Sequence, residues 1–346
     1  MKIVYKSLII SSLVFLGVAC TSSSQEIKPE ELFAVPANFP NPVYDFKKNP
    51  ITSSGFELGR ELFYEGDLSR DGTISCAECH SQASGFTHHG HDVSHGIDNL
   101  KGTRNAPPIQ NMAFQKEFFW DGGVFDLDLF SIAPIENPIE MDEKLGNVLE
   151  KLRKKEKYTN LFQQTYGSKE INTERFLKAL SQFMNSLVSA NARYDKYVRK
   201  ETGGTLTEEE LAGMAIFKQK CASCHAGELF TDQSYRNNGL AIYDKEDTGR
   251  ARITQNDKDD YKFKVPSLRN IAVTAPYMHD GRFYSLEAVL KHYNESVVDS
   301  PTLDGSLKKN QKLGIQTNTN EQKKLIAFLK TLTDDTFLKN KRFAAP

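Results

Sequence analysis

The sequence predicts a mainly α-helical chain that folds into two domains. A five-residue pattern occurs twice, as CAECH at 76–80 and as CASCH at 221–225. Apolar residues recur at helical spacing in three longer segments, 141–167, 173–198 and 319–334, whereas strand signals are weak and short. The 346 residues are enough for two such domains.

The sequence around the two patterns is a diverged repeat. Each half has a helical run that contains a glycine and then a phenylalanine, Gly59 and Phe63 in the first half and Gly213 and Phe217 in the second. The cysteine pattern follows in both halves, and Phe-Thr comes shortly after it. One structural unit is therefore expected to occur twice.

The segment 200–210, KETGGTLTEEE, separates the two units. A Gly-Gly turn is followed by a helix start, with Thr207 as N-cap and Glu210 three residues later. The predicted division assigns a signal peptide, a lipidated tether with an N-terminal strap, a first domain and a second domain to residues 1–19, 20–45, 46–202 and 203–346.

Four of the five cysteines belong to the repeated pattern. Cys-x-x-Cys-His is typical of covalent haem attachment, in which two thiols form thioether bonds to the haem vinyl groups and the histidine binds the iron. The alternatives are one four-cysteine zinc site or disulfides in an oxidising compartment. Zinc gives no reason for a histidine after each pair, so two cytochrome c-like domains with one c-type haem each are expected. The attachment residues are Cys76, Cys79, His80, Cys221, Cys224 and His225.

The fifth cysteine follows an export signal. Residues 1–20 have a basic start and an apolar run that is too short to span a bilayer comfortably. Small residues precede Cys20, which resembles a bacterial lipoprotein signal that is cleaved before a lipidated cysteine. An ordinary secretory signal with an incidental cysteine is the alternative. Both predict export to the periplasmic side, and the first adds membrane contact through a lipid anchor at Cys20.

Charge and histidine distribution narrow the function further. The formal net charge is −1, so there is no basic excess of the kind that nucleic-acid binding requires. Four of the eight histidines, His88, His89, His91 and His95, follow the first cysteine pattern closely. They predict either a ligand near the first haem or a solvated cluster that binds metal adventitiously.

Three further segments carry a family resemblance. Residues 102–123, 134–141 and 265–294 (GTRNAPPIQNMAFQKEFFWDGG, PIENPIEM and VPSLRNIAVTAPYMHDGRFYSLEAVLKHYN) resemble the di-haem cytochrome c peroxidase and MauG superfamily. The resemblance covers residues 50–335. It implies haems on either side of a domain interface. His80 would ligate the peroxidatic iron, and His225 would ligate the iron of the electron-entry haem.

The resemblance also implies two catalytic residues. Glu140 matches the catalytic glutamate, which would move a proton between the two oxygens of peroxide as the O–O bond breaks. An acid near a helix start, after the Asn137-Pro138 turn, is the alternative. Trp120, the only tryptophan, matches the residue between the haems and would assist electron transfer. An ordinary core aromatic is the alternative.

A calcium ion at the domain interface is the next implication. Asn105, Thr274 and Pro276 match the residues that hold it in the family. Calcium prefers carbonyl and amide oxygens, and these three residues come from both halves of the chain. Plain turns would explain the same residues.

Two departures concern the first haem. Phe130 replaces the usual glutamine ten residues after the tryptophan, which predicts a less polar distal pocket. His95 is the nearest counterpart of the histidine that ligates the resting peroxidatic iron, but its spacing to the next motif is two residues longer. His88, His89 and His91 compete with it.

The distal ligand of the second iron divides the family. Typical peroxidases have a methionine, and MauG has a tyrosine on the same helix, where this chain has Tyr293. Met278 and His292 are the rivals, and a packed helix residue is the structural alternative. A thioether raises the reduction potential, whereas a phenolate favours ferric iron and lowers it.

The expected function is reduction of hydrogen peroxide to water by an exported, lipid-anchored di-haem peroxidase. Its electrons would come from a small cytochrome or a cupredoxin, and a homodimer is considered. A MauG-like enzyme that oxidises protein side chains and a pure electron-transfer cytochrome are the alternatives.

Overall fold

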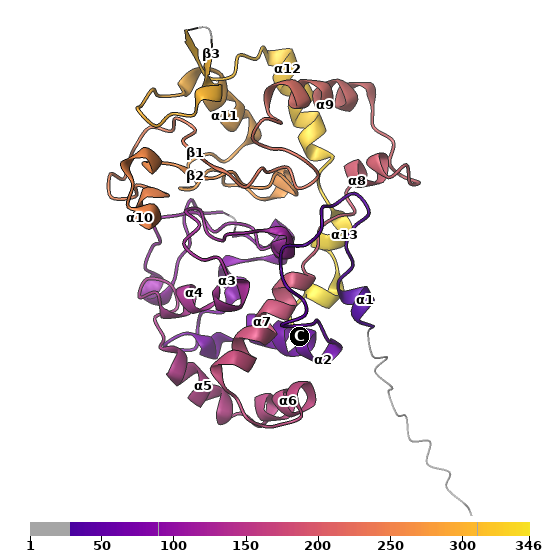
Figure 1. The fold of residues 1–346 in the computed structure, drawn as a ribbon, viewed down its shortest axis with the longest axis vertical. Helices are drawn as coiled ribbons and strands as arrows, with labels where there is room; N and C mark the ends of the chain where they lie inside the picture. Colours follow the sequence, from indigo (N-terminus) through magenta and orange to yellow (C-terminus); the bar gives the residue numbers. More distant parts are fainter. Residues whose placement is uncertain (1–27, 89, 310) are drawn as a thin grey trace, which may run out of the picture.

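The computed structural model describes residues 28–88, 90–309 and 311–346, so the predicted signal peptide and Cys20 lie outside the described residues. The chain forms two mostly helical lobes, one above the other in Figure 1. Within the described ranges, strands form only two antiparallel pairs, β1 (Tyr235–Arg236) with β2 (Phe263–Lys264), and β3 (Lys308–Lys309) with β4 (Lys312–Leu313). The predicted mainly α-helical class is confirmed.

The first lobe is built on the crossing of α2 (Ser53–Phe63) with α7 (Thr173–Ser186). Side-chain caps fix both helix starts, because Thr52 accepts a hydrogen bond from the Gly55 amide and Asn172 accepts one from the Arg175 amide. The helices approach closely at Gly59, where a Cβ atom would overlap the carbonyl oxygen of Ala179. Two further helices, α5 (Leu145–Arg153) and α6 (Glu156–Tyr166), complete the lower end of this lobe in Figure 1.

The second lobe repeats this construction with α9 (Glu208–Lys220) and α12 (Thr319–Lys330). The predicted capping box at Thr207 and Glu210 is confirmed, since each residue satisfies a backbone amide of the other. A Cβ at Gly213 would overlap the carbonyl oxygen of Lys324. The repeated glycine therefore marks the same close helix crossing in both lobes.

Short helices connect these pairs and carry the motifs. A π-helical turn at His292–Ser296 continues α11. The other short helices are α1 (Pro29–Leu32), α3 (Cys76–Cys79), α4 (Ile132–Glu136), α8 (Arg193–Val198), α10 (Ala251–Thr254), α11 (Leu286–Lys291) and α13 (Asp335–Leu338).

Two main hydrophobic clusters divide the chain differently from the predicted domain limits. Tyr194 precedes the expected boundary after residue 202, yet it packs with Phe230 and Phe328 in the second cluster. Phe337 and Phe343 lie near the carboxy terminus but belong to the first cluster. The Gly-Gly turn marks where a helix begins, whereas tertiary packing decides which core a side chain joins.

The segment before α2 spans the junction of the lobes. Phe39 packs edge-on against Phe114. The guanidinium carbon of Arg269 lies over the Phe39 ring, 4.4 Å from the ring centroid. Arg269 in turn pairs with Asp195 at 2.7 Å, and both side chains are fully buried. Asn38 also donates to Asp195, at 3.0 Å. This N-terminal segment therefore covers a buried ion pair.

Candidate functional site

The first CxxCH motif opens into a pocket in the first lobe. The cavity, its open mouth included, measures about 570 Å³. Cys76, Cys79 and His80 line it together with Glu140, the only carboxylate among the described residues of its lining. The predicted attachment residues and the predicted catalytic residue therefore meet in one cavity.

The orientation of His80 suits a metal ligand. Its Nδ1 lies 2.8 Å from the carbonyl oxygen of Phe86, which can only accept, so Nδ1 carries the proton and Nε2 keeps its lone pair. Burial lowers the pKa of His80 to about 4, which keeps the imidazole neutral. Thiols and imidazole together fit a covalently held haem.

Glu140 lies in the turn between α4 and α5. Its backbone is fixed by Ile97, whose amide donates to the Glu140 carbonyl at 2.7 Å. The side-chain amide of Asn137 donates to Oε1 of Glu140 at 2.7 Å. Burial raises the pKa of Glu140, and the bond from Asn137 partly opposes that rise. Glu140 does not cap α5, because that helix begins at Leu145.

The wall around Glu140 is largely apolar. Phe130 lines the pocket, is buried, and stacks on Phe119 with ring centroids 4.7 Å apart. Leu180 and Met184 of α7 contribute further apolar surface. Phe130 offers no hydrogen bond to the cavity, which agrees with the less polar distal pocket expected from the sequence.

The second motif has the same histidine arrangement. Nδ1 of His225 lies 3.2 Å from the carbonyl oxygens of Phe230 and Pro266, and burial lowers the pKa of His225. Tyr293 faces this motif from the π-helical turn. The pKa of Tyr293 is raised to about 12, mainly by burial and to a smaller extent by the thiols of Cys224 and Cys221, while the side chain of Asn238 opposes the rise.

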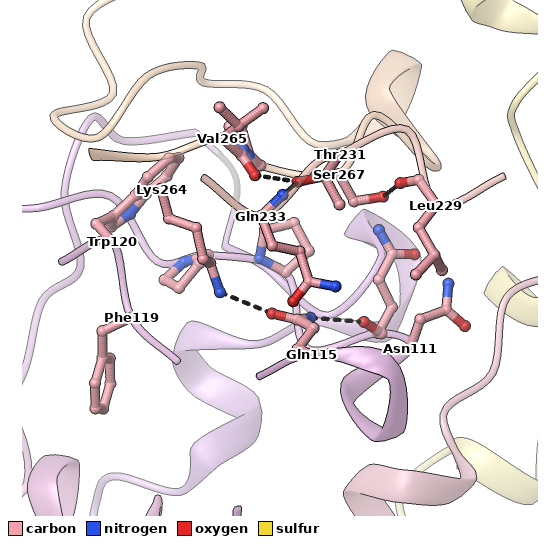
Figure 2. A pocket seen from close by; sticks show the side chains of 14 residues that line it. Asn111, Gln115, Phe119, Trp120, Leu229, Thr231, Gln233, Lys264, Val265 and Ser267 are labelled. Atoms are coloured by element: carbon pink, nitrogen blue, oxygen red, sulfur yellow. Dashed lines mark hydrogen bonds between the residues drawn. The ribbon is translucent and has the colours of Figure 1, made fainter. Parts of the chain in front are cut away.

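Trp120 lies between the lobes, as Figure 2 shows. Its indole Nε1 donates to the carbonyl of Asn105 at 2.8 Å, and its own carbonyl accepts from the amide of Lys264 on β2 at 2.7 Å. The Lys264 ammonium donates to Gln115 Oε1 at 2.8 Å, and both residues line a cavity to which both lobes contribute. Trp120 therefore belongs to the interface as well as to the core.

Comparison with known proteins decides the family. A family model described as di-haem cytochrome c peroxidase matches residues 53–203. The methylamine utilization protein MauG of Methylophilus methylotrophus is 32% identical over 331 residues, which is 94% of each chain. The chain belongs to the di-haem cytochrome c peroxidase and MauG family.

Other members of this family agree with that assignment. The cytochrome c551 peroxidase of Nitrosomonas europaea is 34% identical over 290 residues, 83% of this chain and 82% of the relative. The crystal structure of a MauG-like protein associated with microbial copper homeostasis has 33% identity and a TM-score of 0.81. That match covers 90% of this chain and 98% of the other. The family fold thus extends over both lobes.

The residues that match the family's calcium site come together in part. The Asn105 side-chain amide donates to the Pro276 carbonyl at 2.7 Å, which links the two halves. Asn105 Oδ1 is buried without a hydrogen-bond partner. Thr274 is also buried, and its hydroxyl donates to the carbonyl oxygen of Ile271 at 3.4 Å. An orphaned amide oxygen beside a carbonyl fits the ligands that calcium prefers.

His95 is not in the lining of the first pocket. Its neighbours Ser94 and Gly96 line that pocket, whereas the His95 ring contacts Asn99 at 2.7 Å and lies 4.8 Å from the His91 ring. His88 is buried nearby, and residue 89 lies outside the described ranges. In the described part of the chain, no three His, Cys, Asp or Glu side chains form a group suited to a metal ion.

Three residues near the sites were not singled out from the sequence as functional. Asn137 orients Glu140, Lys264 lies beside Trp120, and Asn238 contacts the rival ligands of the second iron. The position of Asn137 three residues before Glu140 could have indicated the hydrogen bond between their side chains. Lys264 and Asn238 reach their sites through tertiary packing, which no local sequence pattern indicates.

None of the described helices has the length and apolarity needed to cross a membrane.

Proposed function

We propose that this chain is an exported di-haem peroxidase that reduces hydrogen peroxide to water. Cys76 and Cys79 attach the peroxidatic haem, and His80 ligates its iron. Cys221, Cys224 and His225 do the same for the electron-entry haem. The observation that carries the proposal is that, in the part of the chain that the structure describes, Glu140 is the only carboxylate lining the pocket of the first motif.

The haem, when bound, would supply an iron that binds peroxide. It would also supply the two electrons that break the O–O bond. Glu140 would accept the proton from one peroxide oxygen and return it to the other, which leaves as the first water. The remaining oxygen becomes the second water with two electrons from the donor and two protons from solvent. Asn137 holds the carboxylate in place. The apolar wall around it raises its pKa towards neutral pH, where a proton acceptor and donor is most effective.

Electrons enter singly from a small cytochrome or a cupredoxin and pass from the second lobe to the first. Trp120 is the candidate bridge, since hydrogen bonds fix both its indole and its backbone at the interface. A calcium ion held by Asn105, Thr274 and Pro276 would stabilise the same interface.

The remaining proposals concern the surroundings of the enzyme. Cys20 carries a lipid anchor on the periplasmic side, after removal of residues 1–19. His95 is retained as the candidate resting-state ligand, which would require its side chain to turn into the first pocket.

Replacement of Glu140 by glutamine tests the proposal directly. We expect peroxide turnover to fall roughly 100-fold, the scale of a lost general acid–base group, while a haemochrome assay still finds two haems. Glu136→Gln, an exposed carboxylate on α4, is the matched control and should keep full turnover. Wild-type turnover in Glu140→Gln would remove Glu140 from the mechanism.

A further inference from the structure

The segment of the first lobe that carries Trp120, residues 114–122, is bound by the second lobe along its length. Trp120 contacts both lobes, since its indole donates to the Asn105 carbonyl and its own carbonyl accepts from the Lys264 amide. In Figure 1 the β1–β2 pair lies at the side of the second lobe that faces the first. Tyr235 of β1 and Lys264 of β2 are opposite each other in this pair, so their side chains lie on the same face.

The Lys264 side chain holds the segment on the amino-terminal side of Trp120. Its ammonium donates to Oε1 of Gln115 at 2.8 Å and to the main-chain carbonyl of Glu117 at 2.7 Å. Figure 2 shows the bond to Gln115 and the indole of Trp120 at the same cavity. Both acceptors are neutral oxygens, so this ammonium fixes the course of the segment rather than forming an ion pair.

The Arg250 side chain holds the segment on the carboxy-terminal side of Trp120. Its Nη1 donates to the carbonyl oxygens of Asp121 and Gly122 at 2.8 Å and 3.1 Å. Its Nη2 lies 3.2 Å from Oε1 of Glu117, whose Oε2 accepts from the Tyr235 hydroxyl. A Cβ atom at Gly122 would overlap both the Tyr235 hydroxyl and the Arg250 guanidinium. The fit of the segment against the second lobe is therefore close.

We propose that Lys264 and Arg250 are positioning residues that hold Trp120 in place for electron transfer between the haems. The inference rests on the proposed function, because it takes Trp120 as the bridge. Small displacements of a reacting group can lower a rate strongly, so a bridge fixed on both sides keeps the transfer fast. Docking of the lobes alone would not require the donors to converge on main-chain carbonyls before and after one indole.

The test removes each donor and observes Trp120 directly. Trp120 is the only tryptophan, so the ultraviolet resonance Raman bands of indole report on this residue alone. In Lys264→Met and in Arg250→Met we expect the band that is sensitive to the indole hydrogen bond to shift or broaden. Lys262→Met is the matched control, since Lys262 pairs at 3.1 Å with Asp259 of its own lobe, and this variant should keep the wild-type band.

A kinetic measurement on the same samples tests the consequence for electron transfer. Half-reduced protein is mixed rapidly with peroxide, and oxidation of the second haem should slow several-fold in Lys264→Met and Arg250→Met but not in Lys262→Met. Redox titration of both haems separates a displaced bridge from a changed driving force. If one of the two variants folds poorly, the other gives the result.

A wild-type band and a wild-type rate in the folded variants would overturn the inference, and so would a change in only one of the two measurements. Haem content and donor turnover of the unmodified protein are measured alongside. Fewer than two haems, or no reduction of peroxide, would contradict the proposed function instead. The Raman comparison would then still decide whether the two side chains hold Trp120.

Discussion

Two opposing influences on one carboxyl group set the chemistry at Glu140. Burial among apolar side chains raises its pKa, and the hydrogen bond from Asn137 moderates the rise. A proton acceptor must be ionised before peroxide arrives, so activity should be lost on the acid side at a higher pH than an ordinary glutamate would give. The pH profile of kcat/KM therefore reports on this pair.

Asn137→Asp changes that balance with little change in shape. The aspartate keeps the oxygen that accepts from the Ile139 amide, but it replaces the donor to Glu140 with a negative charge. Both effects raise the pKa of Glu140 further, so the acid limb of kcat/KM should move to higher pH. Steady-state kinetics across the pH range measures the limb, and an acid limb at the wild-type position would contradict the role of Asn137.

Individual residues were predictable where a motif fixed their chemistry. The two CxxCH motifs indicated His80 and His225, and the resemblance placed Glu140 and Phe130, which share one pocket. His95 stays an untested prediction, because the path of its loop depends on packing that spacing does not describe. The contacts of Asn238 could not be predicted, since its partners lie 40 or more residues away in sequence.

Glycines at the helix crossings determine how closely the elements pack. Gly59 and Gly213 occupy equivalent places in the two lobes, and each lies against a carbonyl oxygen of the facing helix. The sequence repeat suggested the equivalence, and the capping box gave the start of α9. The π-helical turn that presents Tyr293 was not predicted, because an inserted residue in a helix leaves no clear periodic signal.

Gly213→Ala is expected to destabilise the protein by about 1–3 kcal/mol, because α9 and α12 must separate to admit the methyl group. Gly146→Ala is the matched control. It lies in α5 with open space where a Cβ would be, so alanine should stabilise by about 0.5–1 kcal/mol through its helix propensity. Denaturant unfolding of both variants compares the free energies. Equal stability of Gly213→Ala and wild type would mean that the crossing tolerates a wider spacing.

Because electrons would pass between the two haems, the docking of the lobes should affect turnover. Arg104 of the first lobe pairs with Asp121 and, across the interface, with Asp247, each at 2.6 Å. Burial raises the pKa of Asp247, but Arg104 outweighs it and brings this pKa below the usual value. Local sequence indicated the two lobes and an N-terminal strap, but not this ion pair or the contacts of the strap at the junction of the lobes. Both depend on contacts between distant residues.

Arg104→Met should leave Asp121 without its cation and Asp247 with only the more distant Arg252, 3.9 Å away, and should destabilise the protein by about 3 kcal/mol. Turnover should fall while both haems remain attached, because the lobes dock less firmly. Arg70→Met is the matched control, since Arg70 also bridges two aspartates, Asp98 and Asp142, but on the exposed surface of one lobe. Its effect on stability should be much smaller, because exposed ion pairs are screened by solvent. An equal loss in both variants would refute a special role for the interface.

The most direct test of the central claim is the stoichiometry of peroxide reduction by the protein with both haems, using a reduced small cytochrome c as donor. Two donor molecules should be oxidised for each peroxide consumed. The Cys221→Ser/Cys224→Ser variant should lose one covalent haem and nearly all donor turnover. Two haems without peroxide-dependent donor oxidation would contradict the account and leave the two alternatives, a MauG-like enzyme that oxidises protein side chains and a pure electron-transfer cytochrome.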